Sequence, residues 1–197
     1  FLGCENLKEL SIPGTVVRLG NESLLDIETI KIPKVISGIL YASTDLSYRS
    51  ANHSVKKIIT DNRLYYIPIQ LKSAPLYRIS QYECTYGRIP DDIYTHALTT
   101  ELKQDTAYYI YKNRKNNVSN DVVEIQKYLK RCAKKIAIRY MMDTDKQKFT
   151  EFLNEGLLSK AALKELLKLA EQRDDTSAAA YLLAAIDEQT PCSSFRL

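Results

Sequence analysis

The side chains that most often carry catalysis are few in this chain and lie far apart in the sequence. His53 and His96 are its two histidines, and neither has a cysteine or a second histidine close to it. Metal binding and nucleophilic catalysis each need several such groups together. We therefore interpret both histidines as surface or structural residues, and we expect no metal site, no cofactor and no enzyme activity.

Phosphate-binding and carboxylate chemistry are also poorly supported. Neither G-x-G-x-x-G nor G-x-x-x-x-G-K-[ST] occurs, so the sequence contains no local phosphate-binding loop. Asp91-Asp92 and Asp174-Asp175 are adjacent carboxylates, but both pairs stand where helices are expected to begin. Capping of those helices accounts for them. An active site assembled from distant residues stays an alternative that no motif supports.

A row of basic side chains is the strongest candidate for a binding site. It comprises Lys127, Lys130, Arg131, Lys134, Lys135 and Arg139. Spacings of three and four residues place most of them on one face of a helix. Such a face can follow a nucleic-acid backbone or another anionic surface, or it can dock an acidic protein. It can also be a solvated face that pairs with the acidic helices expected after Asp143.

The helix that carries this row is expected over residues 121–141, with Ser119 or Asn120 as its cap. Its predicted buried stripe is Ile125, Leu129, Cys132, Ala133, Ile136 and Tyr140. A preceding helix is expected over residues 90–112, because Pro90 suits the first turn of a helix. Its predicted inner face is Ile93, Ala97, Leu98 and Leu102.

Three short helices are expected after residue 143, and their starts and stops are visible in the sequence. Thr144-x-x-Gln147 fits a capping box, Gly156 can close a helix in the left-handed conformation, and Ser159 can cap the next helix. The predicted buried residues are Phe149, Phe152, Leu153, Leu163, Leu166, Leu167, Ala170, Ala178, Tyr181, Leu182, Ala185 and Ile186. The last two helices are expected to lie antiparallel, with Leu167 facing Leu182.

The first part of the chain contains a repeat. Leu7-Lys-Glu-Leu10-Ser-Ile12-Pro13 returns twenty residues later as Ile27-Glu-Thr-Ile30-Lys-Ile32-Pro33. The alternating apolar end of each copy predicts a strand that its proline terminates. Residues 55–60 and 63–67 are further predicted to form a β-hairpin, with Asp61-Asn62 as its turn.

Two resemblances follow from these motifs. Phe1-Leu-Gly-Cys4-Glu-Asn-Leu7-Lys-Glu-Leu10-Ser-Ile12-Pro13 resembles the bacterial BspA-like leucine-rich repeat, although the second copy lacks the Gly-Cys pair. The stretch from Leu166 to Leu183 resembles an ankyrin-type helix–turn–helix, without the Thr-Pro-Leu-His opening of ankyrin repeats. The wider pattern resembles uncharacterised bacterial leucine-rich-repeat proteins. These resemblances imply a solenoid scaffold that binds other proteins.

The predicted fold class is therefore α+β, a short leucine-rich-repeat-type strand region followed by an all-helical, ankyrin-like solenoid region. Residues 1–70 form the strand region with its hairpin, and residues 71–89 form a connector. Residues 90–188 form the helical region, and residues 189–197 are expected to be a flexible tail.

The composition is that of a folded protein and points to no single class of partner. The 197 residues are 45% hydrophobic and 26% charged, with a net charge of +4. No apolar run is long enough to cross a bilayer, and no signal peptide is visible, so we expect no membrane insertion. The four scattered cysteines, Cys4, Cys84, Cys132 and Cys192, are expected to be free thiols, which slightly favours the cytoplasm. Because the chain begins with Phe1, we also consider it as part of a longer protein.

A non-catalytic protein-interaction or scaffold module is the function that we expect, with an unidentified protein as partner. The alternative is binding of nucleic acid or another anionic surface through the basic helix over residues 121–141. Fourteen tyrosines are present, and we expect most of them to pack at half-buried positions. On a binding surface they would serve as anchors.

Overall fold

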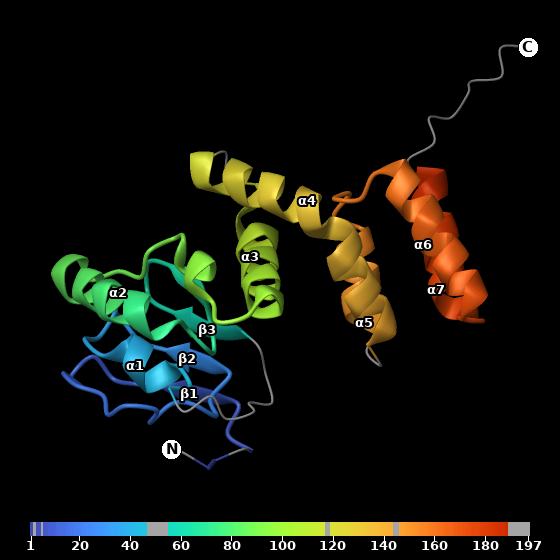
Figure 1. Ribbon diagram of the computed structural model, residues 1–197. Helices are drawn as coiled ribbons and strands as arrows, with labels where there is room; N and C mark the ends of the chain where they lie inside the picture. Colours follow the sequence, from blue (N-terminus) through green and yellow to red (C-terminus); the bar gives the residue numbers. More distant parts are fainter. Residues whose placement is uncertain (2, 5, 47–54, 117–118, 144–145, 189–197) are drawn as a thin grey trace, which may run out of the picture. The chain divides into compact units, whose positions relative to one another are not determined.

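The computed structural model describes residues 1, 3–4, 6–46, 55–116, 119–143 and 146–188, and within them the protein is α+β. The described strands all precede the longer helices, as predicted (Figure 1). Contacts between Cα atoms divide the chain into two compact units, one from Phe1 to Val122 and one from Val123 onward. Each unit is described separately below. The predicted tail, the predicted cap at Thr144 and His53 lie outside the described residues.

The first unit is built on a four-stranded sheet. Its strands are β1 (Glu9–Ser11), β2 (Thr29–Lys31), β3 (Val55–Ile59) and β4 (Leu64–Pro68), in that order across the sheet. Strands β1, β2 and β3 pair in parallel, and β4 returns antiparallel to β3. The predicted hairpin is confirmed, and its turn is closed by the Thr60 amide, which donates to the Arg63 carbonyl at 2.8 Å.

The register of the sheet matches the sequence repeat. Leu10 of β1 lies opposite Ile30 of β2, which stands twenty residues later, and Ile30 lies opposite Ile58 of β3. The two copies of the repeat are thus neighbouring parallel strands. Each copy ends in a proline two residues after its strand, where the missing amide N–H leaves the ladder without a donor.

Two helices share a core with the inner face of this sheet. They are α1 (Ile39–Ser43) and α2 (Ser73–Tyr86), which lie next to each other (Figure 1). The core includes Ile30, Ile58, Ile67, Leu76 and Ile79. The stretch over residues 71–89, expected as a connector, is therefore largely a packed helix. Its inward positions are Leu76, Ile79, Ser80 and Glu83, and the two polar members weaken the helical pattern.

The single helix predicted over residues 90–112 is wrong in one respect. A short 3₁₀ helix η1 (Ile93–His96) and α3 (Thr100–Arg114) are separated by an extended segment. Ala97 forms a β-bridge with Leu71, and the Leu98 amide donates to the Gln70 carbonyl at 3.0 Å. Thr99 then caps α3 by accepting from the Leu102 amide. A distant backbone partner thus interrupts the helix.

Helix α3 belongs to the first unit because it packs on β4. The rings of Tyr66 in β4 and Tyr109 in α3 are stacked with their centroids 5.4 Å apart. This packing carries the first compact unit past the predicted division at residues 71–89, as far as Val122.

The second unit is helical in its described residues. Helix α4 (Asn120–Met142) begins at the end of the first unit, where predicted, and α5 (Lys146–Leu153), α6 (Lys160–Gln172) and α7 (Thr176–Glu188) follow. In α4 the predicted stripe is buried except for Cys132, which is half-buried. Gly156 has a φ of 63°, and Ser159 caps α6 by accepting from the Ala162 amide. Those two predictions are confirmed.

The pair formed by α6 and α7 buries fewer residues than predicted. Leu166, Ala170, Ala178 and Leu182 are buried, whereas Leu167 is half-buried. Tyr181 is 44% exposed, so its predicted burial is wrong. Ala178 and Leu182, four residues apart, form the buried stripe of α7, and Tyr181 lies beside this stripe next to the exposed residue Ala180.

Candidate functional site

The basic row lies on α4, and the structure divides it into two groups. Lys127, Lys130, Arg131, Lys134 and Lys135 are exposed, as the spacing predicted. Arg139 is different because it is half-buried, with its guanidinium 4.9 Å from the centre of the Tyr140 ring. A cation over an aromatic ring is held by the electrons of the ring. Arg139 therefore does not extend the exposed row.

Acidic neighbours neutralise part of the row. Lys127 lies 2.8 Å from a carboxylate oxygen of Glu124, and Lys134 forms a salt bridge with Glu165 of α6. Hydrogen bonds from these lysines hold the pKa of Glu124 and the pKa of Glu165 below the usual range. Lys130, Arg131 and Lys135 form no salt bridge in the described part of the chain, although the charge of Arg131 also helps to lower the pKa of Glu124.

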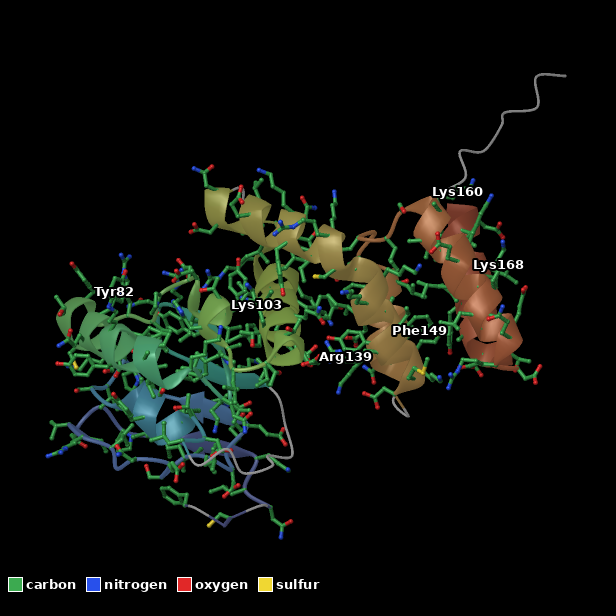
Figure 2. The ribbon with its side chains drawn as sticks, in the orientation of Figure 1. Tyr82, Lys103, Arg139, Phe149, Lys160 and Lys168 are labelled. Carbon is green, nitrogen blue, oxygen red and sulfur yellow. The ribbon has the colours of Figure 1, made fainter. Side chains whose placement is uncertain are left out.

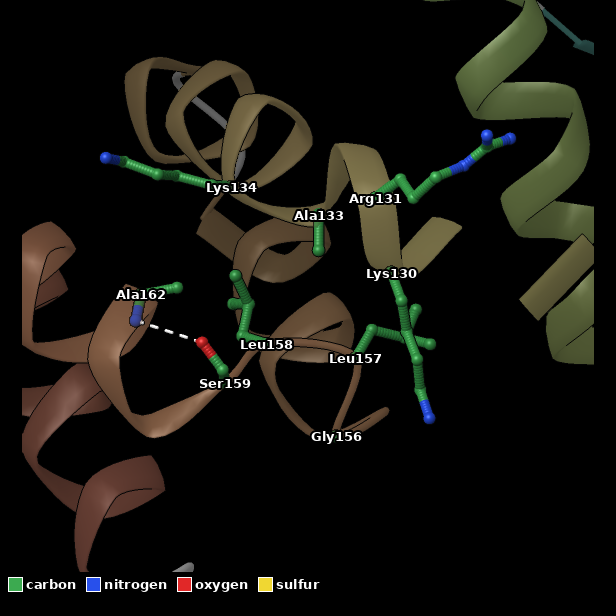
Figure 3. A pocket seen from close by; sticks show the side chains of 9 residues that line it. All are labelled: Lys130, Arg131, Ala133, Lys134, Gly156, Leu157, Leu158, Ser159 and Ala162. Carbon is green, nitrogen blue, oxygen red and sulfur yellow. Dashed lines mark hydrogen bonds between the residues drawn. The ribbon is translucent and has the colours of Figure 1, made fainter. Parts of the chain in front are cut away.

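A cavity of about 370 Å³ adjoins the row, next to the start of α6. Lys130, Arg131 and Lys134 line it together with Leu157 and Leu158. Figure 3 shows that the three basic side chains extend in three different directions. Their charged ends do not converge on one point, so the cavity lacks the arrangement that would bind a phosphate or carboxylate group.

A second exposed surface was not predicted from the sequence. It lies on the outward side of α2 and the residues just after it, and Figure 2 shows the place of Tyr82 on this helix. We call it the α2 tyrosine surface, and it comprises Tyr77, Arg78, Gln81, Tyr82, Tyr86 and Arg88. Tyr77 is 61% exposed and Tyr86 is 62% exposed, so neither supports the core.

The aromatic side chains of this surface are held in place by their neighbours. The Gln81 amide donates to the Tyr77 hydroxyl, and the Arg88 Nε donates to the Tyr82 hydroxyl, each at 2.8 Å. The Arg88 guanidinium also lies 5.5 Å from the centre of the Tyr82 ring and 6.0 Å from that of Tyr86. The two rings are 4.6 Å apart. The surface is thus ordered although it is exposed.

The α2 tyrosine surface carries positive charge. Arg78 and Arg88 are exposed, and Lys72 precedes the helix. The one acidic residue between positions 73 and 88 is Glu83, which is buried and directed toward α1. The outward face of α2 is therefore both aromatic and basic.

Glu83 is one of two buried ionisable residues in the described part of the chain whose pKa is strongly shifted. Its carboxylate accepts from the Ile39 amide at 3.1 Å, at the start of α1, where Gly38 has no side chain for capping. Burial raises the pKa of Glu83 to about 7, against the hydrogen bonds from the amides of Ile39, Leu40 and Gly38. Glu83 thus provides the helix cap that the local sequence lacks.

Lys56 of β3 is the second buried residue whose pKa is strongly shifted. Its fully buried ammonium donates to the carbonyls of Leu24 and Leu25, at 2.5 and 2.9 Å. Burial lowers the pKa of Lys56 to about 7, against the charges of Asp26 and Glu28. Both buried groups bind backbone atoms of the fold, which assigns them a structural role.

The remaining candidates for chemistry also have structural partners. His96 is half-buried, and its carbonyl accepts from the Lys72 amide. The predicted role of Asp91 as a helix cap is wrong. Its carboxylate instead accepts hydrogen bonds from Arg63 at 2.5 Å and from Arg114 at 2.6 Å. Burial alone would raise the pKa of Asp91, yet these two arginines lower it below the usual value.

The acidic pair Asp174-Asp175 and the cysteines likewise form no reactive site among the described residues. Asp175 caps α7, as predicted, by accepting from the Ala178 amide at 3.0 Å, and it also pairs with Lys146. Within the described residues, no group of three or more His, Cys, Asp or Glu side chains is placed to hold a metal ion. Cys4 and Cys84 are exposed thiols, while Cys192 lies outside that part of the chain.

No helix in the described part of the chain is long and apolar enough to cross a membrane. No family model matches this sequence, and no curated protein or solved structure matches it either.

Proposed function

We propose that this chain is a non-catalytic protein-binding module and that its partner surface is the α2 tyrosine surface. The observation that carries the proposal is the state of Tyr77, Tyr82 and Tyr86. Two of them are more than 60% exposed, yet Gln81 and Arg88 hold the tyrosine side chains in place.

Tyrosine and arginine are over-represented among the residues that dominate protein–protein binding energy. A tyrosine offers a large contact area and one polar atom for few rotatable bonds. Side chains that are already ordered lose less conformational entropy when a partner binds. The Tyr82–Tyr86 pair with Arg88, and Tyr77 with its partner Gln81 on the same helix, combine these properties.

The charge of the surface selects the kind of partner. Because no acidic side chain is exposed over residues 73–88, the surface attracts a protein segment that carries Asp or Glu beside its apolar residues. Glu83 sets the orientation of α2, since its bond to α1 turns the side of the helix that carries Tyr77, Arg78 and Gln81 outward.

We further propose that the strand region is of the leucine-rich-repeat type and that α5, α6 and α7 are ankyrin-like. The in-register pairing of β1 with β2 and the short turns between the helices support this assignment. Repeat units of both kinds commonly present binding surfaces on a rigid frame. This architecture is consistent with a scaffold, although a fold alone does not specify function.

Binding of nucleic acid or another anionic surface through α4 is the second candidate. Lys130, Arg131 and Lys135 favour it, because they are exposed and form no salt bridge among the described residues. Three such charges support weak, sequence-independent binding.

The proposal is tested by selecting peptides from a random display library on the immobilised chain. The variant Tyr77→Ser/Tyr86→Ser removes the two exposed anchors, and Lys130→Glu/Lys134→Glu is the matched control on α4. Selected peptides should be acidic, should lose binding to the tyrosine variant and should bind the α4 variant as they bind the wild type. Both variants should unfold within about 0.5 kcal/mol of the wild type, because the changes are at the surface. Peptides that bind the tyrosine variant unchanged would overturn the proposal.

A further inference from the structure

The Arg88 side chain is held in place by two tyrosines of the α2 tyrosine surface. Its Nε donates to the Tyr82 hydroxyl at 2.8 Å, and its guanidinium lies 5.5 Å from the centre of the Tyr82 ring and 6.0 Å from that of Tyr86. Arg78, the other arginine of this surface, has no such contact within the described residues. Arg88 is therefore an ordered cation, although it is exposed.

Most N–H donors of this guanidinium have no acceptor. A guanidinium presents its donors in a rigid planar fork. In the described part of the chain only Nε has a hydrogen-bond acceptor, so the N–H groups of the two terminal nitrogens stay open. A guanidinium that lies over aromatic rings contacts them with its face and keeps the donors at its edge. Two parallel N–H groups at that edge match the two oxygens of one carboxylate.

The acidic side chains closest to Arg88 in sequence do not occupy these donors. Glu83 is buried and accepts from the Ile39 amide of α1. The Asp91 carboxylate is bound to two other arginines, and the exposed Asp92 forms no salt bridge with Arg88. The open donors are thus placed to bind a carboxylate that a partner supplies.

We infer that Arg88 is the carboxylate receptor of the α2 tyrosine surface and that it binds an Asp or Glu side chain of the partner. The inference rests on the proposed function and adds the residue that selects the partner. A phosphate group carries a charge of about −1.5 to −2 at neutral pH and is bound by clusters of arginines. Arg88 is a single guanidinium with one positive charge, which one carboxylate balances.

The distance between Arg88 and Tyr86 indicates how the acid is placed in the partner. In an extended segment, side chains two positions apart lie on the same face about 6.6 Å from each other. The Arg88 guanidinium and the Tyr86 ring are 6.0 Å apart, and the ring is exposed. An acid on Arg88 and a large apolar side chain on Tyr86 therefore suit positions i+2 and i of an extended segment.

The probe is acetyl-Phe-Gly-Glu-amide, titrated to millimolar concentration into the isotope-labelled full chain. The NMR signals of the backbone amides and of the arginine Nε–H groups are recorded. Shifts are expected from Tyr82 to Arg88 and at the Arg88 Nε–H. Acetyl-Phe-Gly-Gln-amide lacks only the charge and should bind about fivefold more weakly, the upper end for an exposed ion pair. Acetyl-Phe-Glu-Gly-amide has the composition of the probe with the other spacing and should also bind more weakly.

Two variants separate binding of the carboxylate from ordering of the tyrosines. Arg88→Gln should remove the difference in affinity between the Glu and Gln peptides. Arg78→Gln, the matched control, removes the same charge from the same surface and should keep that difference. If Arg88 only ordered the tyrosines, Arg88→Gln would weaken both peptides and leave their difference unchanged, which would overturn the inference.

Three further outcomes would also overturn it. They are equal binding of the two glutamate peptides, tighter binding of acetyl-Phe-Gly-phosphoserine-amide, and no shift on α2. The last result would show that another part of the chain already covers Arg88, or that its donors bind no carboxylate. If display-selected peptides still lost binding to Tyr77→Ser/Tyr86→Ser, the proposed function would stand without this inference. Peptides that bound that variant unchanged would remove both.

Discussion

The Glu83 carboxylate of α2 accepts a hydrogen bond from the Ile39 amide of α1 at 3.1 Å, although the two residues stand 44 positions apart. This bond ties a long helix to the start of a very short one. It also fixes the rotation of α2 about its axis, because Glu83 must face inward. Tyr77, Arg78 and Gln81 are consequently on the outward side, where the proposed partner binds.

The first prediction concerns the pH dependence of stability at Glu83. Burial raises the pKa of Glu83 from an ordinary value of 4.5 to about 7, so the folded state holds this proton more tightly than the unfolded state. The resulting stabilisation is complete below pH 4.5 and is lost as the pH rises through 7, by a free energy on the order of 3 kcal/mol. Glu83→Gln should remove this dependence in urea unfolding between pH 4.5 and 7.5. The exposed Glu171→Gln is the control, and parallel profiles for all three proteins would contradict the prediction.

The second prediction is that the buried Lys56 makes the free energy of unfolding depend on pH in the opposite direction. Burial lowers the pKa of Lys56 from 10.5 to about 7, so the folded state holds this proton less tightly than the unfolded state. The stabilisation is complete above pH 10.5 and is lost as the pH falls to 7, by a free energy on the order of 4 kcal/mol. Lys56→Met should therefore flatten the unfolding free energy between pH 7 and 10 relative to Lys57→Met. If Lys57→Met flattened the pH profile of the unfolding free energy equally, the buried ammonium of Lys56 would not be the cause of that pH dependence.

The third prediction concerns the helix pair of the second unit. Leu166 is fully buried, so Leu166→Ala should lower the free energy of unfolding by about 2–5 kcal/mol. Leu167→Ala should cost less because Leu167 is half-buried, and Leu183→Ala should cost under about 0.5 kcal/mol because Leu183 is 51% exposed. Urea unfolding followed by helical circular dichroism measures all three. A larger loss for Leu167→Ala than for Leu166→Ala would reverse the assignment of the buried face.

The second candidate function predicts weak binding of duplex DNA through α4. Because Lys130, Arg131 and Lys135 are the exposed cations of the row that form no salt bridge in the described residues, the slope of log K against log salt should be no steeper than about −3. Titration of labelled duplex and single strand at low and near-physiological salt measures it, with Lys130→Glu/Lys134→Glu as the test variant. The control is Lys72→Glu/Arg78→Glu, which makes the same charge change on the α2 side. Tight, salt-resistant binding that the α4 variant abolishes would overturn the protein-binding proposal, and no binding at low salt would remove the candidate.

Features that depend on neighbours in sequence could be predicted. The repeat spacing of twenty residues gave the parallel strands, because each copy carries its own alternation and its own terminating proline. The hairpin, the turn at Gly156 and the caps at Ser159 and Asp175 are likewise local.

Features that depend on distant partners could not be predicted. The inward face of α2 includes the polar residues Ser80 and Glu83, which break the apolar period that would predict a packed helix. Glu83 can be buried because its carboxylate accepts from the Ile39 amide of α1, a partner that the local sequence does not reveal. The break before α3 arises from the bridge between Ala97 and Leu71, which the local sequence does not reveal. The α2 tyrosine surface cannot be predicted for the same reason as α2 itself, because without a clear apolar period residues 71–89 are predicted to be a connector.

The central claim is that partners bind through α2. It is tested most directly by mapping a display-selected peptide on the isotope-labelled chain through backbone amide NMR shifts. The account predicts shifts concentrated between Tyr77 and Arg88, and their loss in Tyr77→Ser/Tyr86→Ser. Shifts confined to α4, with α2 unchanged, would contradict it.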